Sequence, residues 1–442
     1  MIRFAPQQIE IQHSPAAFAM APAPSVSNRE QMRALRPGAT FDVERLHGPD
    51  EAVAAYLGAV RVRPRGTERV GLEAAFGRIL ARDAIADVRY PADARSTMDG
   101  FAVRSEDRDA PRRIVGTIRM GHAPPGPLRP GEAMRIPTGG VLPPGADAVL
   151  PVEDAAEHGD QLVPAAVPAA GDCFTPAGDD MDPGDVVLRA GRRIAAAELS
   201  VLATLGVVAV EVYLRPRVAI VSTGDELVDP GARPGPGQVR DSNRWAVAGG
   251  LMALGCEVLH LPRAADEVET IRDRIAAGLA AADAVVLTGG SSVGARDHVP
   301  AAIDALGPPG VVVHGLRVKP GKPTVFGAAG TQPVIGLPGN PTSALTILDA
   351  IASEVFRALT GETGARRATV AAVAAEPFSG RAGWTWYVPA VLDGEGGARP
   401  LVLRSSHTSL LARADGYVVL GPAVSRIEAG APVTVVRYAG AE

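Results

Sequence analysis

The sequence predicts a multidomain protein of mixed α/β and β architecture, built around a doubly wound α/β domain. Its 442 residues are more than one hydrophobic core usually serves, so about two to four domains are expected. Apolar strands alternate regularly with helices between residues 215 and 362, a pattern typical of a largely parallel sheet. Short apolar runs broken by Gly and Pro occupy 96–178 and 363–442, which indicates all-β domains.

The N-terminal part is interpreted as a tail followed by half of a linking domain. Residues 1–40 are rich in Ala and Pro and carry charges within their apolar stretches, so we expect a disordered extension and not a signal peptide. Helical periodicity follows in 41–95, and a strand-and-helix pattern returns in 179–214. These two segments are predicted to form one discontinuous α+β linking domain, into which a β-rich domain (96–178) is inserted.

The α/β domain is predicted at 215–362, element by element. Its strands are expected at 217–222, 256–261, 283–288, 311–318, 324–327 and 333–337. Its helices are expected at 242–254, 266–280, 298–306 and 341–360. The C-terminal segment, 363–442, alternates apolar and polar residues and is expected to form a small β-barrel or sandwich.

Composition excludes several classes of function. The net charge of −5, without a Lys/Arg run, argues against binding to nucleic acid or to anionic membranes. The two cysteines, Cys173 and Cys256, lie outside any CxxC motif, which argues against disulfide scaffolds and thiolate zinc sites and for a reducing compartment. Because no stretch of about 18 apolar residues occurs, we expect no membrane span and a cytoplasmic location.

The chain uses Arg for almost all of its basic residues. Lys and Arg together number 44, yet the only lysines are Lys319 and Lys322, both in VKPGKP. A chain that otherwise uses Arg is expected to keep Lys where a compact ammonium is needed and a planar guanidinium does not fit.

Five loops of unusual composition follow predicted strands of the α/β domain. Ligands of open α/β sheets bind outside the carboxyl ends of the strands, where these loops lie. Each loop alone is also explained as a turn or a helix N-cap, but five at one edge predict a ligand site. The loops are STGDE (222–226), AADE (264–267), TGGSSVGARD (288–297), KPGKP (319–323) and GLPGNPTS (336–343).

The motifs also restrict the chemistry. Neither the Rossmann nor the Walker spacing is present, and no HExxH motif occurs. Carboxylates without His or Cys partners favour a hard cation such as Mg²⁺. We therefore predict Asp225 and Glu226 as metal ligands, with the phosphates of the substrate completing the shell of the ion.

The motifs STGDELV, GGSSVGARD, VKPGKP and GLPGNPTSA, with STMDGFAV and IPTGGVLPPGADAV upstream, closely resemble the MoeA/gephyrin E-domain family of molybdopterin molybdenumtransferases. The resemblance spans about residues 41–442 in family order, although 215–362 alone also resembles molybdopterin adenylyltransferases. It implies that adenylylated molybdopterin and molybdate are the substrates. The pyrophosphate bond would be hydrolysed with Mg²⁺, molybdenum inserted at the dithiolene and AMP released.

The resemblance also implies site residues. Lys319 and Lys322 would neutralise an oxyanion, whereas Asp225, Glu226 and Asp297 would hold Mg²⁺ or orient the attacking oxygen. The predicted catalytic residues are Asp225, Glu226, Asp297, Lys319, Lys322, Asp99, Thr138 and Asp180. The predicted substrate-binding residues are Ser222, Thr223, Gly289, Gly290, Ser292, Gly294, Asp266, Pro338, Asn340 and Pro341.

The family forms an elongated dimer, so the resemblance implies a homodimer with its active site at the subunit interface. Asp99, Thr138 and Asp180 would then act on the α/β domain of the partner subunit. Turn and cap roles within the β-rich domain are the alternative for these three residues. Further expected partners are molybdopterin adenylyltransferase and the molybdoenzymes that receive the product.

The chain departs from the family pattern at several positions. Asp179 stands where the family has Glu, and Ser291 stands where it has an apolar residue; both are expected to alter ligand contacts. His407 and Asp415, in SSHTSLLARADG, are expected to affect only the C-terminal barrel. Two alternative functions stay open: adenylyltransferase or other pyrophosphate chemistry on the same module, and a non-enzymatic scaffold that delivers molybdopterin.

Overall fold

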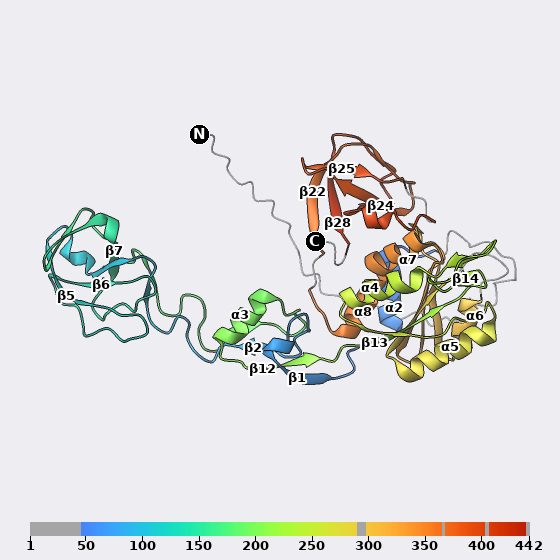
Figure 1. The fold of residues 1–442 in the computed structure, drawn as a ribbon, viewed down its shortest axis with the longest axis horizontal. Helices are drawn as coiled ribbons and strands as arrows, with labels where there is room; N and C mark the ends of the chain where they lie inside the picture. Colours follow the sequence, from blue (N-terminus) through green and yellow to red (C-terminus); the bar gives the residue numbers. More distant parts are fainter. Residues whose placement is uncertain (1–45, 290–297, 365–366, 403–405, 439–442) are drawn as a thin grey trace, which may run out of the picture.

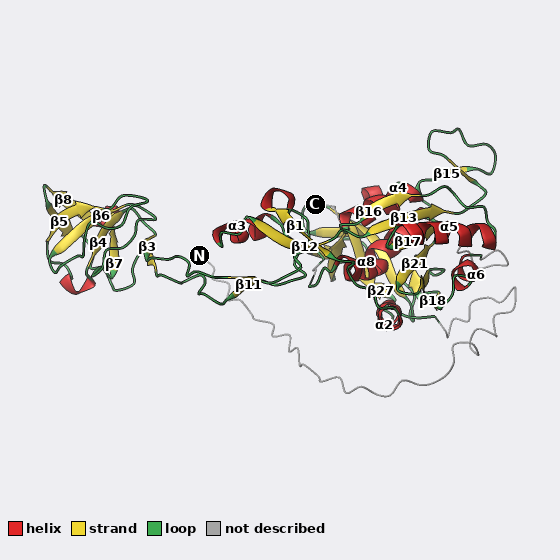
Figure 2. Cartoon of the chain, turned by 90° about the horizontal axis from the view of Figure 1, so that it is seen from below, coloured by secondary structure: helices red, strands yellow, loops and turns green. Residues whose placement is uncertain are grey.

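The computed structural model describes residues 46–289, 298–364, 367–402 and 406–438, so the predicted extension at 1–40 lies outside the described residues. The described chain is elongated (Figure 1). The β-rich domain lies at one end, the linking unit in the middle, and the α/β domain with the C-terminal barrel at the other end. The view from below gives the same order (Figure 2).

The α/β domain contains a six-stranded sheet with the order β16-β13-β17-β21-β20-β18. The pairings from β16 to β21 are parallel, and β20 pairs antiparallel with both of its neighbours. The strands are β13 (Arg217–Ser222), β16 (Glu257–His260), β17 (Ala284–Thr288), β18 (Pro309–His314), β20 (Val325–Ala329) and β21 (Gln332–Leu337). The helices are α4 (Asn243–Ala253), α5 (Val268–Ala281), α6 (Val299–Asp304), α7 (Pro341–Ile347) and α8 (Ser353–Thr360). The short strands β14 (Leu227–Val228) and β15 (Val239–Arg240) pair with each other.

Two of the predicted elements are divided in the structure. The helix predicted at 341–360 contains a π-helical segment, η5 (Leu348–Ala352), between α7 and α8. The strand predicted at 311–318 ends at His314, and β19 (Val318–Lys319) leaves the sheet to pair with β24 (Thr385–Leu392) of the C-terminal domain. Gly315, at φ 87°, allows the chain to change direction between the two strands.

Both faces of the sheet are buried, which agrees with the predicted doubly wound sheet. Alternate residues of β13 enter two separate cores: Val218 and Ile220 on one face, Ala219 and Val221 on the other. The helix α2 (Pro49–Ala59) packs against the first face, and its Tyr56 hydroxyl donates to the carbonyl of Gly327 (3.0 Å). The structure therefore places this helix with the α/β domain, although the sequence analysis assigned its segment to the linking domain.

The linking unit and the β-rich domain have separate cores. In the linking unit β1 (Thr67–Gly71) pairs with β12 (Ala209–Tyr213) and β2 (Ala84–Ile85) with β11 (Val186–Leu188), beside α3 (Ala196–Thr204). The β-rich domain has one sheet with the order β7-β4-β6-β5-β9-β8. Its strands are β4 (Gly100–Val103), β5 (Arg112–Thr117), β6 (Glu132–Ile136), β7 (Ala148–Pro151), β8 (Ala155–His158) and β9 (Gln161–Pro164), and β3 (Arg95–Ser96) pairs with β10 (Phe174–Thr175) at its base.

The C-terminal domain is a closed barrel, one of the two architectures predicted. Its pairings run from β24 through β25, β22, β28 and β26 back to β24, so the ring leaves no free edge. The remaining barrel strands are β22 (Thr369–Ala374), β25 (Gly397–Pro400), β26 (Gly416–Leu420) and β28 (Pro432–Arg437); β23 (Phe378–Ser379) pairs with β27 (Arg426–Ile427).

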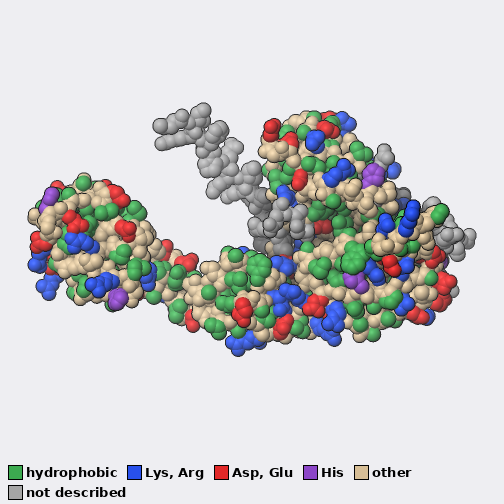
Figure 3. Space-filling model, in the orientation of Figure 1, with side chains coloured by type: hydrophobic (Ala, Val, Ile, Leu, Met, Phe, Trp, Pro, Cys, Tyr) green, Lys and Arg blue, Asp and Glu red, His purple; other side chains and the backbone are tan. Residues whose placement is uncertain are grey.

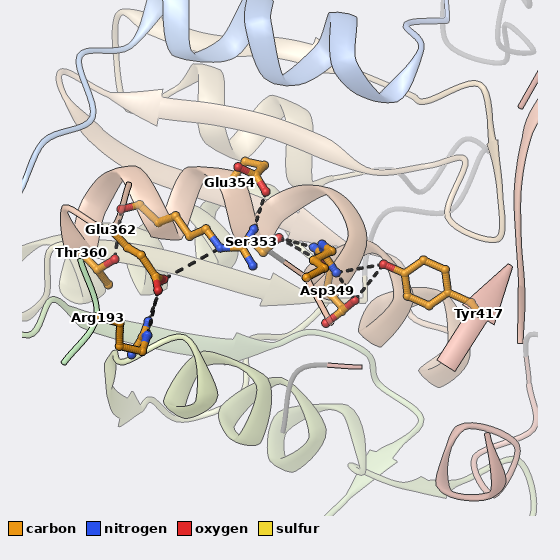
Figure 4. A network of polar contacts seen from close by, with 9 residues as sticks. Arg193, Asp349, Ser353, Glu354, Thr360, Glu362 and Tyr417 are labelled. Carbon is orange, nitrogen blue, oxygen red and sulfur yellow. Dashed lines mark hydrogen bonds and ion pairs between the residues drawn. The ribbon is translucent and has the colours of Figure 1, made fainter. Parts of the chain in front are cut away.

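Two polar clusters fix the α/β domain to its neighbours (Figure 4). Arg367, in the connection to the barrel, donates hydrogen bonds to Asp349 of the π-helical segment and to Ser353 of α8. The Tyr417 hydroxyl of the barrel also donates to Asp349 (3.0 Å). On the other side Arg193 of the linking unit donates two hydrogen bonds to Glu362 (2.8 and 2.7 Å). These contacts tie the barrel and the linking unit to the helix that follows β21.

The surface agrees with the modest net charge. Side chains of both signs are interspersed over the face drawn in Figure 3. Among the described helices, none is long and apolar enough to span a bilayer.

Candidate functional site

The site lies where the strand order of the α/β sheet reverses. From β13 the chain passes through α4 to β16 on one side, and then through α5 to β17 on the other side of β13. At such a switch point the loops after the two central strands diverge and leave a crevice, which is the usual ligand site of open α/β sheets.

A cavity of about 1200 Å³ occupies this position. Its wall combines the ends of β13, β17 and β21 with the start of α4. The loop near Ser406 and Thr408 of the C-terminal domain closes one side. The predicted site residues that line the cavity are Thr223, Glu226, Asp266, Gly289, Pro338, Asn340 and Pro341.

Other predicted residues lie beside the cavity or outside the described residues. Ser222 is fully buried at the end of β13, and its hydroxyl pairs with that of Thr288 (3.4 Å). Asp225 is exposed, and its carboxylate lies 3.5 Å from the backbone nitrogen of Asp266. Gly290, Ser292, Gly294 and Asp297, and the variant position Ser291, lie outside the described residues.

Gly289 is required by the close approach of two strand ends. Its φ is 96°, and a Cβ at this position would lie 2.2 Å from the carbonyl oxygen of Thr223. Any larger residue would clash with the end of β13, so only glycine allows this close approach between the end of β17 and Thr223.

Two buried polar residues that the sequence analysis missed line the cavity at the start of α4. Asp241 is 3% exposed and Asn243 is 9% exposed. The amide nitrogen of Asn243 donates to the carbonyl of Gly339 (2.8 Å), which turns the amide oxygen away from that carbonyl. The sequence DSNRW indicated only a helix start, because Ser and Asn are ordinary capping residues.

The cavity wall holds buried oxygens without hydrogen-bond partners among the described residues. They are Thr223 Oγ1, Asp241 Oδ2, Asn243 Oδ1 and Asp266 Oδ1. Buried acceptors are normally satisfied, and each unsatisfied one costs about 1–3 kcal/mol. The Nε of Arg244 lies 4.0 Å from Asp241 Oδ2, so that carboxylate has a nearby charge. The set is suited to a ligand that offers N–H or O–H donors, or to a hydrated cation.

The lysines lie on a loop that borders this site. Pro323 lines the cavity, whereas Lys319 and Lys322 lie outside its wall. Lys319 is exposed, and its Nζ lies 4.7 Å from the ring centroid of Trp386 in the barrel. The backbone carbonyl of Lys322 accepts a hydrogen bond from Leu316 (2.8 Å).

The carboxylates at the site suit a magnesium ion whose binding also requires the phosphates of the substrate. The described residues contain no group of three metal-ligating side chains. Asp225, Glu226 and Asp266 nevertheless bring carboxylates to one edge of the sheet, two of them in the cavity wall. Mg²⁺ is commonly held by one or two carboxylates together with substrate phosphates, which this arrangement can provide.

The predicted catalytic residues outside the α/β domain lie far from the cavity along the elongated chain. Asp99 accepts hydrogen bonds from the backbone nitrogen (2.6 Å) and the hydroxyl (2.9 Å) of Thr138, and these hydrogen bonds lower the pKa of Asp99. Asp180 is exposed near the junction of the β-rich domain with the linking unit. Within one chain the linking unit separates the β-rich domain from the α/β domain (Figure 1).

The loop that carries His407 contacts both α7 and the cavity. Thr342 of α7 donates a hydrogen bond to the carbonyl of His407 (2.8 Å), and the neighbours of His407, Ser406 and Thr408, line the cavity. Because these contacts use the backbone of His407 and its neighbours, the expectation that the side chain of His407 affects only the barrel stays a prediction. Asp415 does stay within the barrel, where its carboxylate accepts from the backbone nitrogen of Leu392 (2.8 Å).

Family models match most of the chain. Residues 48–206 match the MoeA N-terminal region (domain I and II), 219–358 match a probable molybdopterin binding domain, and 371–438 match the MoeA C-terminal region (domain IV).

Relatives with known names are similar over most of their length. The molybdopterin molybdenumtransferase of Bacillus subtilis is 31% identical over 384 residues, covering 84% of this chain and 89% of the relative. That of Nostoc sp. is 35% identical over 305 residues, covering 67% and 70%. A solved structure of the molybdopterin biosynthesis MoeA protein of Pyrococcus horikoshii is 31% identical and covers 89% of this chain and 100% of its own, with a TM-score of 0.66. With this order of domains and this similarity along the chain, the protein belongs to the MoeA family of molybdopterin molybdenumtransferases.

Proposed function

We propose that this chain is a molybdopterin molybdenumtransferase, a transferase of molybdenum cofactor biosynthesis. It inserts molybdenum from molybdate into adenylylated molybdopterin and releases AMP. The observation that carries the proposal is the cavity at the β13/β17 switch point, which combines unsatisfied buried acceptors with exposed carboxylates and a nearby lysine loop. Its volume of about 1200 Å³ is enough for a ligand with both a pterin and a nucleotide part.

The residues of the cavity can divide the work. The buried oxygens of Thr223 and Asn243 would accept hydrogen bonds from the heterocycles or the ribose and fix the ligand in one orientation. Lys319 and Lys322 would hold molybdate or the phosphates as an oxyanion.

Asp225 and Glu226, with Asp266 beside them, would hold Mg²⁺ at the pyrophosphate. A bound Mg²⁺ polarises the pyrophosphate and neutralises charge on the leaving phosphate. The exposed carboxylate of Asp225 can also orient an attacking oxygen through a hydrogen bond.

The proposal includes a homodimer. Asp99 and Thr138 belong to the β-rich domain, and Asp180 lies near the junction of that domain with the linking unit. Because the linking unit separates the β-rich domain from the α/β domain of the same chain (Figure 2), these residues would serve the cavity of a second copy. A closed two-fold pair is the commonest way to bring such surfaces together. We further propose a cytoplasmic location, with molybdopterin adenylyltransferase supplying the substrate and molybdoenzymes receiving the product.

The test is reconstitution with purified chain, adenylylated molybdopterin, Mg²⁺ and molybdate, with AMP measured by chromatography and bound molybdenum by mass spectrometry. We expect AMP release that depends on molybdate and on Mg²⁺, and its near loss in Asp225→Asn. Asp229→Asn, which removes another exposed carboxylate near the same loop, is the matched control and should keep the parental rate.

Three outcomes would contradict parts of the proposal. Consumption of ATP with free molybdopterin would indicate an adenylyltransferase. Tight binding of adenylylated molybdopterin without AMP release would indicate a delivery scaffold. A monomer in light scattering at micromolar concentration would refute the homodimer.

A further inference from the structure

Lys319 lies at the seam between the α/β domain and the C-terminal barrel. The strand β19 pairs in parallel with β24, which sets Lys319 opposite Trp386. The backbone nitrogen of Thr385 donates to the carbonyl of Arg317 (3.0 Å) and fastens the same seam. The barrel therefore supplies the surface on which this lysine rests.

The backbone of the lysine loop is held from the other side. Thr324 Oγ1 donates to the carbonyl of Gly321 (2.7 Å), and a Cβ on Gly321 would lie 2.2 Å from the side chain of Ile347. The loop therefore sits tightly on α7 of the α/β domain. Its position is set by the α/β domain, while the far end of the Lys319 side chain reaches the barrel.

The contact between Lys319 and Trp386 has the geometry of a cation–π interaction. The Nζ lies 4.7 Å from the ring centroid, within the range of about 6 Å over which the ring quadrupole attracts an ammonium. Among the described residues Lys319 forms no salt bridge. An indole face restrains the ammonium without neutralising its charge, so the charge stays available to an incoming anion. A carboxylate in the same place would compete with that anion.

We propose that Trp386 is a positioning residue for Lys319: it holds the extended lysine side chain at the edge of the site, ready to receive a tetrahedral oxyanion. The positioning itself is independent of the reaction; only its benefit to molybdate rests on the proposed function. Lysine loses much rotamer freedom when it is fixed, and the indole confines it before the anion arrives.

The positioning can be tested without substrate, because the chain has only two lysines. Lysine labelled with ¹³C at Cε should give two signals in a carbon–proton correlation spectrum of the whole protein. We expect the ring current of Trp386 to shift one signal upfield. Trp386→Leu should return that signal to the position of a free lysine, and Trp386→Phe should keep part of the shift. Trp384→Leu, which removes the neighbouring indole, should leave both signals in place.

A reciprocal experiment leaves the barrel side of the seam intact. In the background Trp245→Phe, Trp384→Phe, the indole of Trp386 is the only one left, and Lys319→Met should change its emission. This variant keeps a long side chain and should fold normally. If Trp386→Leu leaves both lysine signals unmoved, or Lys319→Met leaves the emission unchanged, the proposal is overturned.

The benefit to catalysis is measured as a split between KM and kcat. Trp386→Leu should raise the KM for molybdate about two- to fivefold, the range expected for one exposed cation–π contact, with little change in kcat. Trp386→Phe should restore part of that loss. Equal KM values in Trp386→Leu and its parent would overturn the role toward molybdate. If neither the parent nor any variant releases AMP, the proposed function fails. The lysine spectra still test whether Trp386 positions Lys319.

Discussion

The contact between the α/β domain and the barrel gives a prediction of stability that can be worked from its atoms. Asp349 accepts a hydrogen bond from Arg367 Nη1 (2.5 Å) and one from the Tyr417 hydroxyl (3.0 Å). The side chains of Arg367 and Asp349 are 21% and 10% exposed, and Tyr417 is 2% exposed. Replacing Asp349 by Ala therefore leaves a guanidinium without its carboxylate and a buried hydroxyl without its acceptor.

The expected loss is moderated by the partners that Arg367 keeps. A charge-assisted hydrogen bond contributes about 1.5–3 kcal/mol, and an unsatisfied buried hydroxyl costs about 1–3 kcal/mol. Arg367 retains hydrogen bonds to Ser353 (2.7 Å) and to the Tyr417 oxygen (2.9 Å). We therefore expect the lower part of the combined range, about 3 kcal/mol, which corresponds to a Tm about 6–12 °C lower for the unit that contains the α/β domain and the barrel.

Differential scanning calorimetry of three variants measures this effect. Asp349→Asn keeps an acceptor for Tyr417 and loses only the charge, so its Tm should fall about half as far as that of Asp349→Ala. Glu428→Ala breaks the exposed ion pair with Arg426, whose partners are 54% and 69% exposed, and should cost less than about 0.5 kcal/mol. The reasoning is refuted if the Tm of Asp349→Ala lies within about 1 °C of the Tm of Glu428→Ala, because the cluster would then contribute no more to stability than an exposed ion pair does.

Three further predictions concern single side chains. Asn243→Ala should raise the KM for adenylylated molybdopterin about two- to tenfold, the value of one neutral hydrogen bond, and an unchanged KM in a steady-state assay would remove Asn243 from the site. The Thr138 hydrogen bonds lower the folded-state pKa of Asp99, so its stabilising contribution is present above its unfolded pKa and is lost as pH falls through the folded value. Thr138→Val removes only the hydroxyl, so the pKa of Asp99 should rise partway toward its ordinary value in a carbon-detected titration, and no rise would contradict this assignment. Burial raises the pKa of Cys256 to about 12, so this thiol should resist a thiol reagent in the native protein and react after unfolding, whereas rapid native labelling of Cys256 in a peptide map would contradict its burial.

The α/β domain was predictable because its strands are short, apolar and separated by helices. The strand predicted at 217–222 has those bounds in the structure, and the helix predicted at 242–254 is observed at Asn243–Ala253. Burial on both faces of a parallel sheet produces continuous apolar runs that stand out from the helices around them.

The missed features depend on contacts between distant segments. The departure of β19 from the sheet is fixed by pairing with a strand of the barrel, about which residues 311–318 carry no local signal. The π-helical segment is fixed in the same way, because Asp349 within it meets Arg367 and Tyr417 from the following domain. Local propensity describes a helix there and cannot register an extra residue in one turn.

The residues of the candidate site likewise differ in whether local sequence could predict them. Thr223 and Glu226 were predictable because they follow a strand directly, at the edge where ligands of such sheets bind. Asn243 was not, because an Asn before a helix has an ordinary capping role in sequence. Only the structure shows that its amide nitrogen is used by Gly339 while its amide oxygen is buried without a partner among the described residues.

The choice of lysine at position 319 joins composition to geometry. Cation–π attraction alone does not explain it, because Arg stacks on indole rings at least as readily as Lys does. The loop that carries Lys319 is fastened to Ile347 on one side and to the barrel strand on the other, so the position of the side chain is set by both domains. What distinguishes Lys from Arg at this position is the charged group at the end of the side chain. A compact ammonium can direct one of its three N–H donors toward a tetrahedral oxyanion while it stays on the ring. A planar guanidinium stacked on Trp386 would direct all its donors within its own plane, parallel to the ring. We therefore propose that the reason for lysine in a chain that otherwise uses arginine lies with the ligand, because the ammonium would contact the indole and an anion at the same time.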